Sequence, residues 1–199
     1  MNLRFLGDAL DHWKGSVFEG LQNSNVLKDF HVDAMASDIE KWGAEDWSLY
    51  AKLLRVENSH IVGHETTLDR IQREKYFKEI PRSGDLFLDP DTGIMPPSRG
   101  NIRQYLKHEE LFSIMNHEQQ RIVAVYQHGN RNLTMRSRVE NIFKLLHLDQ
   151  PNCKYCSYYT SNAALLFLSF QRYRIKAVSS YFWEFLGSHA DNRIYGCEE

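Results

Sequence analysis

Apolar positions along the chain follow two spacings in turn, which predicts helices alternating with short buried strands. Apolar residues recur at helical spacing in six stretches that we expect to form helices: 9–22, 44–55, 67–80, 107–115, 136–148 and 173–186. Short apolar runs bounded by turn residues predict strands at 30–33, 85–89, 121–127, 156–159, 163–169 and 193–195. The run at 121–127 is the clearest, because a continuous apolar run is typical of a parallel strand buried on both faces.

This alternation favours an α/β fold. Strands that alternate with helices form a parallel sheet whose connections cross over its faces. The runs 156–159 and 163–169 are separated by a short polar turn and predict a hairpin that adds an antiparallel edge. We therefore expect a Rossmann-like, doubly wound and mostly parallel sheet with a C-terminal antiparallel hairpin. The 199 residues, 42% of them hydrophobic, suffice for one core, so we expect a single α/β domain over 1–199.

Net charge, apolar run length and cysteine content indicate which partners and which cellular compartment to expect. The net charge is −2, so binding of nucleic acid would need a local basic cluster. No apolar run reaches the length of a membrane span, and the first residues lack the apolar core of a secretory signal. Three cysteines, an odd number, suit a reducing compartment, and the Cys153–Cys156 pair lacks evident further zinc ligands. We expect a cytoplasmic protein without membrane association.

One stretch combines a predicted strand with acidic residues at its end. Residues 83–94 read SGDLFLDPDTGI, in which Asp89 directly follows the apolar run and Asp91 precedes a turn. Open α/β sheets bind ligands at the carboxyl ends of their strands. Two carboxylates there suit acid–base chemistry or a divalent cation held through oxygens, whereas an Asp-rich turn without function is the plain alternative. We take Asp89 and Asp91 as candidate catalytic residues.

A second cluster follows the strand at 121–127. If this strand is the neighbour of the Asp89 strand, as consecutive elements usually are, its end lies close to Asp89. His128 is then placed to act as a general base near neutral pH, unless it is an ordinary loop histidine. Arg131 and Arg136 belong to a small basic cluster that we expect to contact substrate phosphate, with a solvated helix start as the alternative.

Two segments resemble a known enzyme family. Residues 7–14, GDALDHWK, resemble the G-N-x-A-D-V-L-K-H stretch of the bacterial large-subunit ribosomal-RNA adenine-N6 methyltransferases, with three identical positions at the same spacing. Residues 30–37, FHVDAMAS, resemble that family's next motif, an apolar strand followed by D-T-H-A-G. The pair Asp89-Pro90 falls where the family has its catalytic D-P-P-Y.

The resemblance implies a class I methyltransferase-like fold with S-adenosylmethionine as cofactor. It implies that Asp89 orients and polarises the amino group that accepts the methyl group. The matched segments line the cofactor pocket in that family, so the residues expected to line it here are Asp8, Asp11, Lys14 and Asp33. Nucleic acid is the partner that the resemblance suggests.

The sequence also departs from that family. Ser37 replaces a glycine that would let the backbone approach the cofactor, and Asp91-Thr92 replaces a Pro-Tyr pair whose aromatic ring would stack on a flipped adenine. Residues 5–138 are similar to a group of uncharacterised bacterial proteins with G-D-x-x-D-x-x-K, L-D-P-D-(N/T)-G and Y-Q-H motifs. That second resemblance implies a fold and no activity.

Three functions stay open from the sequence. The first is a methyltransferase-like protein that depends on S-adenosylmethionine, and nucleic acid is among its candidate substrates. The second is a metal-dependent nuclease or phosphoesterase in which Asp89 and Asp91 bind Mg²⁺ or Mn²⁺. The third is a non-catalytic interaction protein on a degenerate methyltransferase fold, which the serine at position 37 favours.

Overall fold

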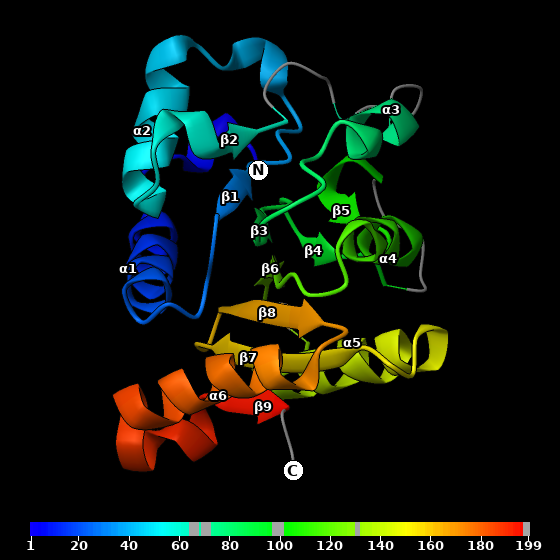
Figure 1. Cartoon of the computed structure of the whole chain (residues 1–199). Helices are drawn as coiled ribbons and strands as arrows, with labels where there is room; N and C mark the ends of the chain where they lie inside the picture. The colour runs from blue at the N-terminus through cyan, green and yellow to red at the C-terminus, as the bar shows by residue number, and fades with distance from the viewer. Residues whose placement is uncertain (64–67, 69–72, 97–101, 130–131, 197–199) are drawn as a thin grey trace.

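A seven-stranded mixed sheet forms the centre of the computed structural model, which describes residues 1–63, 68, 73–96, 102–129 and 132–196 (Figure 1). In spatial order its strands are β2 (Ile61–Val62), β1 (His31–Asp33), β3 (Leu86–Leu88), β6 (Val123–His128), β8 (Ala163–Ser169), β7 (Lys154–Tyr159) and β9 (Ile194–Gly196). The first four are parallel, and β8 and β9 run against the others. The expected α/β class with a mostly parallel sheet is confirmed.

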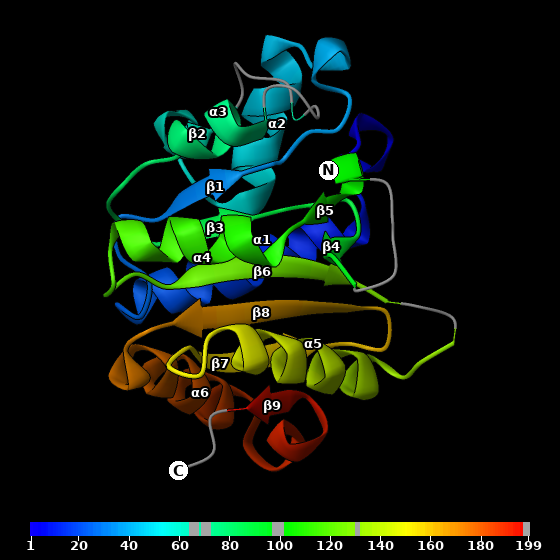
Figure 2. The ribbon, with the colours of Figure 1, turned by 90° about the vertical axis from the view of Figure 1, so that its right-hand side faces the viewer.

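The helices cover both faces of this sheet. They are α1 (Ala9–Asn23), α2 (Ala44–Leu54), α3 (Arg73–Lys78), α4 (His108–His117), α5 (Met135–Asp149) and α6 (Arg172–Leu186). One apolar cluster joins α1, α2 and α6 to one face, and a second joins α3, α4 and α5 to the other (Figure 2). Successive residues of β3 serve different clusters: Phe87 packs in the first, whereas Leu86 and Leu88 pack in the second.

The expected hairpin is present and adds an antiparallel edge to the parallel strands, which β9 extends. Strand β8 lies between β6 and β7, and β9 covers the far side of β7. All seven residues of β8 are buried, so this apolar strand needs a neighbour on each side. Its antiparallel pairing with β6 runs from Val123 opposite Leu168 to His128 opposite Ala163.

A pair of short strands escaped the sequence analysis. Strands β4 (Gly93–Ile94) and β5 (Tyr105–Leu106) form a separate two-stranded sheet beside the carboxyl end of β6. The buried Gln127 side chain fastens β4 in place: its Oε1 accepts from Ile94 N at 2.9 Å, and its Nε2 donates to Thr92 O at 2.8 Å. The turn after Asp91 is thereby held against β6.

The amino ends of the central strands are fastened by a buried carboxylate. Asp85 accepts hydrogen bonds from the backbone nitrogens of Lys28 and Ile122, each at 2.7 Å. It also forms an ion pair with Arg174 of α6 at 2.6 Å. This side chain thus joins three segments that are distant in the sequence.

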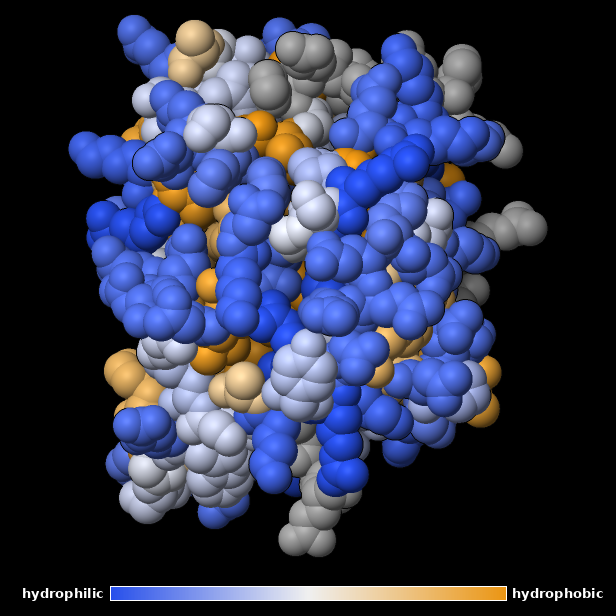
Figure 3. Space-filling view, viewed as in Figure 1, coloured by the Kyte–Doolittle hydropathy of each residue, from blue (hydrophilic) through white to orange (hydrophobic). Residues whose placement is uncertain are grey.

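The surface seen from the side of Figure 1 is largely hydrophilic, with apolar residues visible only in small separate areas (Figure 3). Among the helices of the described residues, none combines the length and apolar character that crossing a membrane requires.

Candidate functional site

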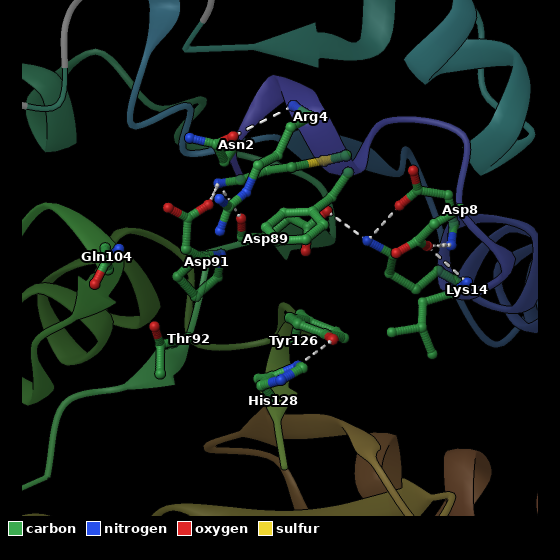
Figure 4. Close-up of a pocket in the computed structure, with 15 residues that line it drawn as sticks. Asn2, Arg4, Asp8, Lys14, Asp89, Asp91, Thr92, Gln104, Tyr126 and His128 are labelled. Atoms are coloured by element: carbon green, nitrogen blue, oxygen red, sulfur yellow. Dashed lines mark hydrogen bonds and ion pairs between the residues drawn. The ribbon is translucent and has the colours of Figure 1, made fainter. Parts of the chain in front are cut away.

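A pocket of about 280 Å³ opens at the carboxyl ends of β3 and β6, beside the first turns of α1 (Figure 4). Its lining includes most of the candidate residues from the sequence: Asp8, Asp11, Lys14, Asp89, Asp91 and His128. Residues that the sequence analysis did not single out complete it, among them Met1, Arg4, Gln104 and Tyr126. The parallel pairing of β3 with β6, with Leu88 opposite Val125, brings Asp89 and His128 to one edge of the sheet, as expected for neighbouring strands.

A buried ion cluster forms the floor of this pocket. The Lys14 ammonium lies 2.7 Å from Asp11 Oδ1 and 2.7 Å from Asp89 Oδ2. All three side chains are at most 4% exposed. Burial disfavours the Lys14 charge, but the two carboxylates outweigh burial and raise the pKa of Lys14. Burial raises the pKa of Asp89, and the Lys14 ammonium opposes that rise.

Local capping at the start of α1 places this cluster. Asp8 is the N-cap residue of α1, and its Oδ1 accepts from Leu10 N at 2.8 Å and Asp11 N at 3.2 Å. Asp11 Oδ2 accepts from Gly7 N at 2.9 Å, which leaves Oδ1 for Lys14 one helical turn later. The GDALDHWK motif is therefore a folded unit that presents a lysine to the end of β3.

Two tyrosines complete the surroundings of Asp89. Tyr50 of α2 is fully buried and donates from its hydroxyl to Asp89 Oδ2 at 3.2 Å. Lys14 Nζ lies 4.9 Å from the centroid of the Tyr126 ring, within range of a cation–π contact. The sequence alone could have pointed to Tyr50, because a tyrosine on the apolar face of a helix needs a hydrogen-bond partner for its hydroxyl.

Asp91 lies on the other side of Asp89 and has partners of its own. Its Oδ2 accepts from Ser37 Oγ at 2.7 Å, and its Oδ1 is 3.1 Å from the nitrogen of Met1. Ser37 thus fixes the acidic turn after β3. Asp89 and Asp91 thus each form hydrogen bonds and ion pairs with other groups of the protein.

Asp33, at the end of β1, is buried beside the site and is not among the residues that line the pocket. Its Oδ1 accepts from the Tyr76 hydroxyl and from Met35 N at 2.7 Å, whereas its buried Oδ2 has no hydrogen-bond partner among the residues that the structure describes. Burial raises the pKa of Asp33 to about 6, against the two hydrogen bonds.

We expect this carboxyl to make stability depend on pH. The folded state holds the Asp33 proton to a higher pH than the unfolded chain, so stability falls as pH rises from about 4 to 6. Asp33→Asn carries no charge at any pH. The free energy of unfolding of this variant minus that of the natural chain should therefore rise by about 1–3 kcal/mol from pH 4 to pH 7. Urea unfolding at both pH values measures this, and a pH-independent difference would contradict it.

Of the two arginines expected to contact substrate phosphate, the structure places only one. Arg131 lies outside the described residues. Arg136, in the first turn of α5, pairs with Glu140 at 3.2 Å and lies over the Tyr195 ring, and it does not line the pocket. Arg4 and His128, both exposed, line the pocket.

The residues described contain no group of three or more His, Cys, Asp or Glu side chains arranged to hold a metal ion. Cys153 and Cys156 are buried, and burial raises the pKa of Cys153 to about 12.

No protein-family model, curated protein or solved structure matches the chain.

Proposed function

We propose that this protein binds S-adenosylmethionine or a related nucleotide in the pocket between α1 and the end of β3, and that it is a methyltransferase-like protein. The observation that carries the proposal is the 2.7 Å contact between Lys14 and Asp89 at the pocket floor. It joins residues 7–14 to the Asp89-Pro90 pair, which both resemble the methyltransferase family, although Lys14 and Asp89 are 75 residues apart in the sequence. Polar groups gathered at the carboxyl ends of parallel strands are the usual ligand site of such sheets.

The pocket fits part of such a ligand. Its volume of about 280 Å³ is at the lower end of the range for small-molecule sites, which suits a nucleoside better than a whole dinucleotide. Asp8 is exposed at the pocket and offers a carboxylate oxygen to sugar hydroxyls. Asp33 Oδ2, which has no hydrogen-bond partner within the described part of the chain, is a second acceptor beside the site.

The roles of the residues follow from their contacts. S-adenosylmethionine, when bound, supplies an activated methyl group. Lys14 and Tyr50 both donate to Asp89 Oδ2, which fixes the carboxylate and leaves Oδ1 to accept from an incoming amino group. His128 Nδ1 contacts the Tyr126 hydroxyl at 3.1 Å, so its Nε2 is the nitrogen placed to accept a proton at the pocket mouth.

A ligand titration tests the proposal, with one variant that removes a charge in the pocket and a control variant that removes the same charge elsewhere. S-adenosylmethionine at about 100 times its Kd should stabilise the natural chain by about 2.7 kcal/mol, which a thermal-shift assay detects. Asp8→Asn removes the charge but keeps a good N-cap, so the fold should be unaffected while affinity falls about tenfold. Asp191→Asn, at an exposed position that does not line the pocket, is the matched control. No shift at millimolar ligand would overturn the proposal.

The same assay with Mn²⁺ tests the nuclease or phosphoesterase alternative. A divalent cation would have to compete with the Lys14 ammonium for Asp89 and with the Ser37 hydroxyl for Asp91. We therefore expect little or no stabilisation by Mn²⁺. A clear shift that Asp91→Asn abolishes would favour metal chemistry over methyl transfer.

A further inference from the structure

Helix α6 has one buried face and one exposed face. The buried face packs on β7 and β8, and its buried residues are Arg174, Ile175, Val178, Ser179 and Phe182 (Figure 1). Exposed residues spaced by three and four positions run along the opposite face and onto the residue that follows the helix: Tyr173, Lys176, Ser180, Trp183, Glu184 and Gly187. We call these six residues the α6 stripe.

Two large aromatic side chains of the stripe are open to solvent. Tyr173 is 59% exposed and Trp183 is 46% exposed. Tryptophan and tyrosine are enriched among the residues that contribute most to protein interfaces, because a ring that leaves water supplies a large contact area. Two such rings on one exposed helix face indicate a surface for another protein.

The charges of the stripe are arranged symmetrically about Ser180. Lys176 lies four residues before it and Glu184 four residues after it. The two charges are about 12 Å apart along the helix axis, too far to pair with each other. Neither side chain has an ion-pair partner among the residues that the structure describes. Each is therefore available to an opposite charge on a partner.

A second copy of the chain supplies these opposite charges. An antiparallel copy, related by a two-fold axis that passes beside Ser180, brings residues that are equally far from Ser180 to the same level. Lys176 of each copy then faces Glu184 of the other, so that two ion pairs form. Trp183 comes beside the same lysine of the other copy, within reach of a cation–π contact.

The same axis also matches large residues with small ones. Tyr173 faces Gly187 of the second copy. The space beside Gly187 is open, because a Cβ at this position would have no heavy atom of the described residues beyond its chain neighbours within 4 Å. Ser180 faces its own copy, and its small side chain lets the two helices approach closely. The stripe is therefore complementary to itself in size as well as in charge.

We propose that α6 forms the interface of a symmetric dimer, in which two α6 stripes pack antiparallel about Ser180. Because one helix of each copy makes the contact, the interface is small, and we expect a Kd that is about micromolar or weaker. The proposed ligand pocket lies at the ends of β3 and β6, away from the strands that α6 covers. The dimer thus stands or falls independently of the proposed function.

Paired charge reversals test the interface and its register together. Lys176→Glu alone sets two negative charges against each other at both ends of the contact, and Glu184→Lys alone sets two positive charges there. Each variant should dimerise at least about tenfold more weakly than the natural chain. In an equimolar mixture of the two variants every contact again joins opposite charges, so a mixed dimer should form with nearly natural affinity. Sedimentation velocity at protein concentrations up to millimolar, with a fluorescent label on one variant, measures this.

Two further variants separate the interface from other effects. Trp183→Ala should weaken dimerisation about tenfold or more, because it removes the larger ring of the stripe. Lys144→Glu, at an exposed position of α5, is the matched charge reversal and should leave dimerisation unchanged. Circular dichroism and urea unfolding of each variant show that the monomer remains folded.

A cysteine at the axis tests the geometry. The Cβ atoms of the two copies of residue 180 meet across the two-fold axis, at a separation that a disulfide can bridge. With oxidised glutathione as the oxidant, Ser180→Cys should therefore give a covalent dimer on non-reducing electrophoresis. Ser16→Cys, at an exposed position of α1, should not, and it also controls for the natural cysteines.

The results decide between the possible partners of the stripe. A mixed dimer that restores affinity, together with the Ser180→Cys link, would establish the antiparallel pairing. A natural chain that stays monomeric at millimolar concentration, without that link, would overturn the dimer and leave the stripe to a partner other than a second copy. A dimer that neither charge reversal nor Trp183→Ala weakens would also overturn the proposal, because its interface would lie elsewhere. Weakening by each single reversal without recovery in the mixture would overturn the register about Ser180.

Discussion

Lys14→Met is expected to destabilise the fold by about 3–5 kcal/mol at pH 7, because it leaves Asp11 and Asp89 as buried carboxylates in a site built around a cation. Methionine has a similar length and packs well, so lost volume contributes little. Urea unfolding at pH 7 measures the effect. Lys144→Met, an exposed helical lysine, controls for the loss of a surface charge and should change stability by less than about 0.5 kcal/mol.

The pH dependence of the Lys14→Met variant gives an independent check. Burial already raises the pKa of Asp89, and loss of the Lys14 ammonium raises it further. A carboxyl with a raised pKa in the folded state stabilises the fold at low pH and loses that contribution as pH rises. The deficit relative to the natural chain should therefore shrink from pH 7 to pH 5. The double variant Lys14→Met/Asp89→Asn should recover part of the loss, and a double variant no more stable than Lys14→Met would refute the charge argument.

Asp85→Ala is expected to cost about 3–5 kcal/mol without touching the pocket. It strips two backbone nitrogens and the Arg174 guanidinium of their acceptor in a buried site. Asp85→Asn keeps one acceptor oxygen and should cost roughly half as much. Chemical denaturation gives both values, with Asp191→Ala as the exposed control.

Ligand binding separates the roles of the two carboxylates of β3. Asp85 lies at the amino end and Asp89 at the carboxyl end of the same short strand. The folded fraction of Asp85→Asn should bind S-adenosylmethionine with natural affinity. A loss of affinity that exceeds the loss of folded protein would show that the two ends of the strand are coupled.

Most elements were predictable because their signals are local. The Asp8 cap and the helical spacing that follows it predict a helix from residue 9, and α1 begins there. The apolar runs at 85–89 and 121–127 contain β3 and most of β6, and the prediction that the two strands are neighbours is confirmed. Such signals need only a few consecutive residues.

The features that sequence reasoning missed depend on contacts between distant segments. The order of β8 and β7 beside β6 depends on which strand is buried on both sides, and no spacing within either strand reveals that order. Strands β4 and β5 have two residues each, too few to show any spacing. Met1 reaches the site only because β1 and β3 are adjacent, and a position at the start of a chain carries no periodic signal.

The candidate site was partly predictable, because its two main motifs are local patterns. Residues 7–14 and 83–94 each have a recognisable local pattern, and the structure brings both to one pocket. The expected phosphate-binding role of Arg136 had no such support, since a basic residue in the first turn of a helix finds a partner as readily in its own helix as in a ligand.

The inserted position of β8 has a consequence for synthesis on the ribosome. Strand β6 emerges first, and its partner on that side emerges only after α5 and β7. Until then the apolar edge of β6 offers unpaired backbone groups to any other extended chain. The nascent protein should therefore depend most on chaperones in this interval, and fragments that end before residue 163 should aggregate where the full chain does not.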